Sequence, residues 1–126
     1  MIQILLVDDA TVDVMLTTIA IESCSVPHTL SVARDGEEAY SMLQETPADL
    51  LLLDIKMQKV NGFDLLEKLR TSDQIVIPTI MLSGSGLQAD RTRARELGAI
   101  EFIQKAVDFS AFKAELKTAM NKHGFC

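Results

Sequence analysis

Long apolar segments, cysteines and basic residues are all scarce in this 126-residue sequence. No apolar run approaches the roughly 18 residues that a membrane-spanning helix requires, so we expect no membrane partner. The only two cysteines, Cys24 and Cys126, form no regularly spaced set, and we expect them to be incidental. The 12 Lys and Arg residues are outnumbered by 18 Asp and Glu residues. The resulting net charge of −6 opposes broad contact with nucleic acid or an anionic bilayer.

The length and composition fit one domain over residues 1–126. A chain of this size buries roughly 65 to 70% of its unfolded surface, so its core needs no disulfide or metal ion. After the last amphipathic segment only residues 123–126 remain, and we therefore expect no output domain. Residues 1–3 lead directly into a short apolar segment and do not resemble a signal peptide. We therefore expect a cytoplasmic protein.

Short apolar segments alternate with amphipathic segments five times along the chain. Expected strands cover residues 2–7, 28–33, 50–53, 77–82 and 100–103. Expected helices cover about 11–23, 36–45, 62–71, 87–97 and 109–122. This alternation predicts an α/β protein with a doubly wound, parallel, five-stranded sheet. The segment 28–33 alternates apolar and polar residues, so we expect it at the edge of the sheet.

Polar residues follow four of the five expected strands. Asp8 and Asp9 follow the first, Asp54 the third, Ser83 the fourth and Lys105 the fifth. In open α/β sheets the carboxyl ends of the strands form the ligand-binding edge, so these side chains should converge there. Each alone has an ordinary alternative explanation: a helix cap for Asp9, a helix-entry carboxylate for Asp54, a turn residue for Ser83 and a solvated charge for Lys105.

The conjunction of these residues predicts a phosphate-handling metal site. Carboxylates held close together repel one another and raise one another's pKa unless a cation lies among them. An oxygen-rich pocket without sulfur or nitrogen ligands suits Mg²⁺ (or Mn²⁺). Lys105 would then offer a positive charge to a phosphoryl oxygen, and Ser83 a hydrogen-bond donor.

Four motifs at these positions resemble a known family. They are LLVDD at 5–9, LLLDIKM at 51–57 followed by Gly62, IMLSG at 80–84 and GAIEFIQK at 98–105. The motifs occur in this order, with 29 residues from Asp54 to Ser83 and 22 from Ser83 to Lys105. With these motifs and spacings, the chain resembles the receiver domain of bacterial two-component response regulators. The resemblance covers essentially the whole chain and is to the stand-alone, chemotaxis-regulator-like type. It implies a flavodoxin-like (βα)₅ fold with strand order 2-1-3-4-5.

The resemblance assigns a role to each acid of the cluster. Asp54 would accept a phosphoryl group from a phosphohistidine of a sensor histidine kinase or phosphotransfer protein. Asp9 and Asp54, with the backbone carbonyl of Lys56, would ligate Mg²⁺ (or Mn²⁺), and Asp8 would hold a metal-bound water. Lys105 would neutralise charge on the phosphoryl oxygens. The protein would promote its own phosphorylation and dephosphorylation, and we do not expect an enzyme acting on a separate substrate.

The resemblance also implies a switch. Ser83 would move toward the new phosphate, and Phe102 would turn inward, remodelling the face formed by segments 87–97, 100–103 and 109–122. A downstream target protein, or a second copy in a homodimer, would bind this face. From the residues alone Phe102 is a plain core aromatic. Lys56 and Ser85 would tune hydrolysis, although a solvated lysine explains Lys56 equally well.

Two residues depart from the family pattern. Gln58 and Ala106 stand where the family usually has prolines, after Met57 and Lys105 respectively. The second proline often follows a cis bond, and a cis bond before a non-proline residue costs roughly 2.5 to 4 kcal/mol. We therefore expect a trans Lys105–Ala106 peptide and an altered path into segment 109–122.

Three other protein classes share part of this pattern. An FMN-binding module of the flavodoxin type needs hydroxyls and N–H groups after its first strand, where Asp8 and Asp9 would repel phosphate. A haloacid dehalogenase-type phosphatase places a second Asp two residues after its nucleophile, whereas here the two acids are adjacent and the next, Asp13, is too distant. The third alternative, a receiver-fold scaffold that binds partners independently of phosphorylation, stays open.

Overall fold

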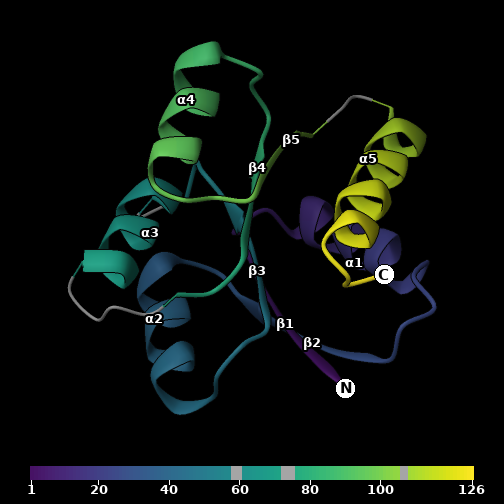
Figure 1. Ribbon diagram of the computed structural model, residues 1–126, viewed down its shortest axis with the longest axis horizontal. Helices are drawn as coiled ribbons and strands as arrows, with labels where there is room; N and C mark the ends of the chain where they lie inside the picture. The colour runs from purple at the N-terminus through teal and green to yellow at the C-terminus, as the bar shows by residue number, and fades with distance from the viewer. Residues whose placement is uncertain (58–60, 72–75, 106–107) are drawn as a thin grey trace.

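The computed structural model describes residues 1–57, 61–71, 76–105 and 108–126 (Figure 1). Gln58 and Ala106, the two departures from the family pattern, lie outside the described residues, as does the expected trans Lys105–Ala106 peptide. Among the helices that the structure describes, none is both long and apolar enough to cross a membrane.

In the described residues, five strands and five helices alternate, close to the predicted segments. The strands are β1 (Ile2–Val7), β2 (His28–Ala33), β3 (Leu50–Asp54), β4 (Thr79–Ser83) and β5 (Glu101–Gln104). The helices are α1 (Thr11–Glu22), α2 (Gly36–Glu45), α3 (Gly62–Thr71), α4 (Gln88–Glu96) and α5 (Phe109–Lys122). Neighbouring strands pair in parallel in the order β2-β1-β3-β4-β5. The predicted fold class, strand order and edge strand are confirmed.

The helices cover both faces of the sheet, with α1 and α5 on one side and α2, α3 and α4 on the other (Figure 1). Alternate residues of one strand point to opposite faces, so Leu50 and Leu52 enter the core under α1 and α5, and Leu51 and Leu53 enter the other core. This double coverage explains why the central strands read as continuous apolar runs.

The boundaries of the elements follow from local chemistry. The carboxylates of Asp35 and Asp108 cap α2 and α5, accepting from the backbone N–H groups of Glu38 at 2.8 Å and Ser110 at 2.9 Å. The fourth strand begins at Thr79, two residues later than predicted. Pro78, which precedes it, has no N–H group to donate to the ladder, and a strand commonly begins after such a residue.

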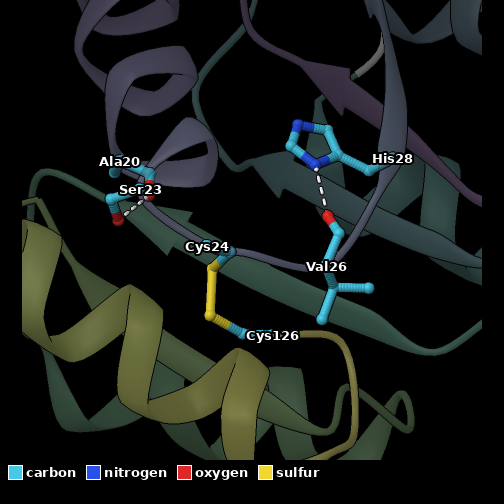
Figure 2. The surroundings of a disulfide bond; sticks show 6 residues. All are labelled: Ala20, Ser23, Cys24, Val26, His28 and Cys126. Atoms are coloured by element: carbon cyan, nitrogen blue, oxygen red, sulfur yellow. Dashed lines mark hydrogen bonds between the residues drawn. A yellow bond between two sulfur atoms is a disulfide. The ribbon is translucent and has the colours of Figure 1, made fainter.

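The expectation that the cysteines are incidental is wrong, because Cys24 and Cys126 form a disulfide with their Cα atoms 5.1 Å apart (Figure 2). The two residues are 102 positions apart in sequence. Ser23 donates its hydroxyl to the Ala20 carbonyl at 2.6 Å as α1 ends, and Cys24 follows directly. Because α1 and α5 pack on the same face of the sheet, the end of α1 meets the C-terminal residues. Cysteine spacing carries no trace of this proximity.

Candidate functional site

Three carboxylates meet at the carboxyl edge of the sheet. Asp8 and Asp9 follow β1, and Asp54 ends β3. Since β1 and β3 are parallel neighbours with Val7 opposite Leu53, the residues that follow lie side by side. One carboxylate oxygen from each of the three acids lies within 4.8 Å of the others. The structure therefore brings together the acids that the sequence pattern predicts.

Lys105 reaches this cluster from the end of β5. Its Nζ lies 2.8 Å from Asp8 Oδ2, 2.9 Å from Asp54 Oδ1 and 3.0 Å from Asp13 Oδ2. Its backbone N–H donates to the Ser83 carbonyl at 2.6 Å, which extends the β4–β5 pairing and aims the side chain at the acids. The ammonium is thus held among three carboxylates.

The electrostatics of the pocket oppose a bare carboxylate at Asp54. Burial raises the pKa of Asp54 to about 6; the charge and hydrogen bond of Lys105 act against this rise, and the charges of Asp8 and Asp9 add to it. Burial alone would lower the pKa of Lys105, but the hydrogen bond to Asp8 and the charge of Asp54 hold it above its ordinary value. The pocket therefore contains a permanent ammonium and more acids than that ammonium can neutralise.

The donor set fits a hard divalent cation. The three clustered acids supply only oxygen atoms, which Mg²⁺ and Mn²⁺ prefer. Asp8 is fully buried, and its Oδ1 accepts the N–H of Ala10 at 2.9 Å, so its orientation is fixed. The N-cap of α1 is Ala10, so Asp9 does not cap this helix. A cation placed among these oxygens would offset the repulsion that burial intensifies.

Ser83, Ser85 and Lys56 lie at or just beyond the carboxyl ends of β4 and β3. Ser83 ends β4, is 2% exposed, and lies one position past the residue that pairs with Asp54. Its Oγ accepts the N–H of Ser85 at 3.0 Å, and Ser85 Oγ accepts the N–H of Leu87 at 3.2 Å. These bonds shape the turn between β4 and α4. Lys56 follows β3 by two residues, and its side chain is exposed.

Phe102 lies in β5, the strand that ends just before Lys105. Its ring is partly buried and packs against the core under α2, α3 and α4. The Arg91 guanidinium of α4 lies over the ring, 4.8 Å from its centroid. A cation over an aromatic face is attracted by the ring's negative charge distribution. Phe102 is therefore a contact between β5 and α4, and it is not sealed in the core.

Two further residues support the site, although the sequence pattern did not predict their roles. Asp13 contacts Lys105, and the available signal was an acid in the first turn of the expected helix, four residues after Asp9. Gly62 opens α3 directly beneath the phosphoacceptor candidate: a Cβ there would collide with the backbone carbonyl of Asp54. The sequence showed Gly62 only as part of a motif, without this steric reason.

Comparisons with known proteins agree with the fold and the arrangement of the site. Residues 4–117 match the model of the response regulator receiver domain. Over 121 residues, 95% of this chain, the sequence is 37% identical to the transcriptional regulatory protein CpxR of Escherichia coli. The chain spans about half the length of the curated relatives it matches first, 50% in the case of CpxR.

Two solved structures illustrate the similarity in three dimensions. The bacteriophytochrome response regulator AtBRR is 34% identical, with a TM-score of 0.80, over 100% of this chain and 94% of that chain. The Mn²⁺-bound form of response regulator Rcp1 is 24% identical, with a TM-score of 0.86, over 96% of this chain and 93% of that chain, and shows the shared fold. On the family match and these relatives, the chain belongs to the response regulator receiver domains of two-component signalling.

Proposed function

We propose that this receiver domain accepts a phosphoryl group on Asp54 and signals through contact with a partner protein. The donor is a phosphohistidine of a sensor histidine kinase or phosphotransfer protein. One observation carries the proposal: Asp54 is 6% exposed at the binding edge, with Asp8 and Asp9 beside it. The Lys105 ammonium lies 2.9 Å from its carboxylate.

The chemistry assigns the transfer to a carboxylate oxygen of Asp54. That oxygen attacks phosphorus, an O–P bond forms, and the N–P bond of the phosphohistidine breaks, leaving its electron pair on the imidazole nitrogen. A pKa of about 6 keeps Asp54 largely ionised at neutral pH, as a nucleophile must be. Lys105 offsets charge on the phosphoryl oxygens.

The cation belongs to the same proposal. Asp9, Asp54 and the backbone carbonyl of Lys56 would hold Mg²⁺ (or Mn²⁺), and Asp8 would hold a water bound to it. When bound, the cation supplies the positive charge that the three acids and the phosphoryl oxygens require. The clustering of the acids within 4.8 Å supports this assignment.

The output is a change on the face formed by α4, β5 and α5. The Ser83 hydroxyl turns to the phosphoryl oxygens, and Phe102 turns inward and leaves its place beneath Arg91. A downstream protein, or a second copy of the chain, binds the altered face. Lys56, two residues after the acceptor, and Ser85, two residues after Ser83, set the rate at which water removes the phosphoryl group. We place this signalling in the bacterial cytoplasm, without direct contact with nucleic acid or membrane.

Intact mass spectrometry tests the proposal. The parent and Asp54→Asn are incubated with acetyl phosphate, with Mg²⁺ or with EDTA. The parent should gain one phosphoryl group only with Mg²⁺, and Asp54→Asn should gain none. No gain in a folded parent that binds Mg²⁺ would contradict the proposal and favour a scaffold that binds partners independently of phosphorylation.

A further inference from the structure

Lys105 is held by a third carboxylate that lies outside the predicted cluster. Asp13 Oδ2 accepts from Lys105 Nζ at 3.0 Å, alongside the contacts to Asp8 at 2.8 Å and Asp54 at 2.9 Å. An ammonium has three N–H donors, and three carboxylates match them. Asp13 stands in the first turn of α1, 92 positions from Lys105 in sequence. The contact therefore depends on the tertiary fold.

The position of Asp13 in α1 does not explain this contact. An acid in the first turn of a helix is stabilised by the helix dipole, and any acid there would gain this effect. The helix dipole would stabilise Asp13 without the contact to Lys105, which follows β5. The side chain of Asp13 is 39% exposed, against 0% for Asp8 and 8% for Asp54. Of the three acids that contact Lys105, Asp13 is thus the one open to solvent, and Lys105 keeps two buried partners without it.

We propose that Asp13 is a positioning residue that shares the charge of Lys105 and limits how strongly this ammonium neutralises a phosphoryl group on Asp54. The inference rests on the proposed function. A phosphoryl group brings new anionic oxygens into a pocket whose ammonium is already surrounded. Asp13 competes with those oxygens for one N–H donor of Lys105, and its own charge repels the incoming phosphodonor. Both effects slow phosphorylation.

The negative charge of Asp13 slows phosphorylation but should strengthen binding of the cation. A fourth carboxylate beside Asp8, Asp9 and Asp54 increases the attraction for a divalent ion. Removing the charge should therefore weaken cation binding while accelerating phosphorylation at saturating Mg²⁺. Structural damage to the site would lower both the cation affinity and the phosphorylation rate. A lower affinity together with a higher rate therefore distinguishes a charge-sharing role from a structural one.

Three variants test the inference. Asp13→Asn keeps the size of the side chain and an oxygen that can accept from Lys105, and it removes only the charge. Asp13→Glu retains the charge. The matched control is Glu45→Gln, which removes one exposed acid at the end of α2, where the chain turns toward the amino end of β3. The measurements are Mn²⁺ affinity without phosphodonor, by electron paramagnetic resonance of free Mn²⁺, and the initial rate with acetyl phosphate at saturating Mg²⁺, by intact mass.

Asp13→Asn should weaken Mn²⁺ binding about two- to fivefold and raise the phosphorylation rate about three- to tenfold, as expected for removal of one partly screened charge. Asp13→Glu and Glu45→Gln should stay within about twofold of the parent in both measurements. A rate for Asp13→Asn equal to or below the parent's, or an unchanged Mn²⁺ affinity, overturns the inference. If the parent gains no phosphoryl group, the proposed function is refuted as well. If the parent is phosphorylated and Asp13→Asn is phosphorylated at the same rate, only the inference about Asp13 is refuted.

Discussion

Replacing Asp54 with Asn should stabilise the metal-free protein at alkaline pH. The pKa of Asp54 is raised from 3.8 to about 6, mainly by burial, so the folded state binds this proton more tightly than the unfolded state. A shift of about two units corresponds to at most about 3 kcal/mol of destabilisation once the carboxyl ionises. Because water screens part of the pocket, we expect about 1 to 2 kcal/mol. Asn stays neutral at every pH and avoids this cost.

The upward direction of the Asp54 pKa shift determines the pH range in which ionised Asp54 destabilises the fold. The destabilisation by Asp54 is fully present above pH about 6, declines between about 6 and 4, and vanishes below 3.8, where both states carry the proton. The gain of Asp54→Asn should follow the same course. Lys105 keeps Asp8 and Asp13 as partners in the variant, so no buried ammonium is left unpaired.

Urea unfolding followed by circular dichroism, in EDTA at pH about 8 and about 4.5, measures this gain. The control is Glu115→Gln, which removes an exposed acid from the middle of α5 and should change little at either pH. Adding Mg²⁺ should stabilise the parent and not Asp54→Asn, since a ligand of the folded state shifts the equilibrium by mass action. An Asp54→Asn variant that is no more stable than the parent at pH about 8, or equally stabilised at both pH values, would refute the account of the pocket's electrostatics.

Three other perturbations follow from the fold. Gly62→Ala should lower the free energy of unfolding by about 2 kcal/mol or more, measured in urea, because its Cβ collides with the Asp54 carbonyl; an unchanged midpoint would contradict this. Reducing the Cys24–Cys126 disulfide should cost about 2 to 4 kcal/mol, and Cys126→Ser should abolish the response to reductant; a parent insensitive to dithiothreitol would exclude the disulfide in solution. Glu101→Gln should cost roughly 0.2 to 1 kcal/mol at neutral pH. Hydrogen bonds from His123, 3.0 Å away, and Lys122, 3.3 Å away, lower the Glu101 pKa. The cost should therefore disappear as acid protonates the parent carboxyl, and a cost that persists in acid would count against these ion pairs.

The sequence predicts the fold well because the parallel sheet imposes strong patterns. Strands buried on both faces, such as β3 from Leu50, read as unbroken apolar runs, and β2 alternates because it lies at an edge. The candidate site is predictable for a related reason. Residues that follow neighbouring parallel strands must meet at one edge, so the strand order that the family resemblance implies places Asp8 beside Asp54.

What escaped prediction depends on packing between distant segments. The pairing of Cys24 with Cys126 requires α1 and α5 to share a face of the sheet, and no local pattern encodes that contact. The contact of Asp13 with Lys105 likewise requires the start of α1 to lie at the end of β5. The sequence places Asp13 in the first turn of α1, yet this position does not specify which side chain meets it there.

The central claim is that Asp54, and no other acid of this crowded pocket, carries the phosphoryl group. Borohydride reduces an aspartyl phosphate to homoserine, so reduction after incubation with acetyl phosphate and Mg²⁺, followed by peptide mass mapping, marks the acceptor residue. We predict homoserine at position 54 alone, dependent on Mg²⁺. Homoserine at Asp8, Asp9 or Asp13, or at none of these acids in a folded, Mg²⁺-binding sample, would contradict the account.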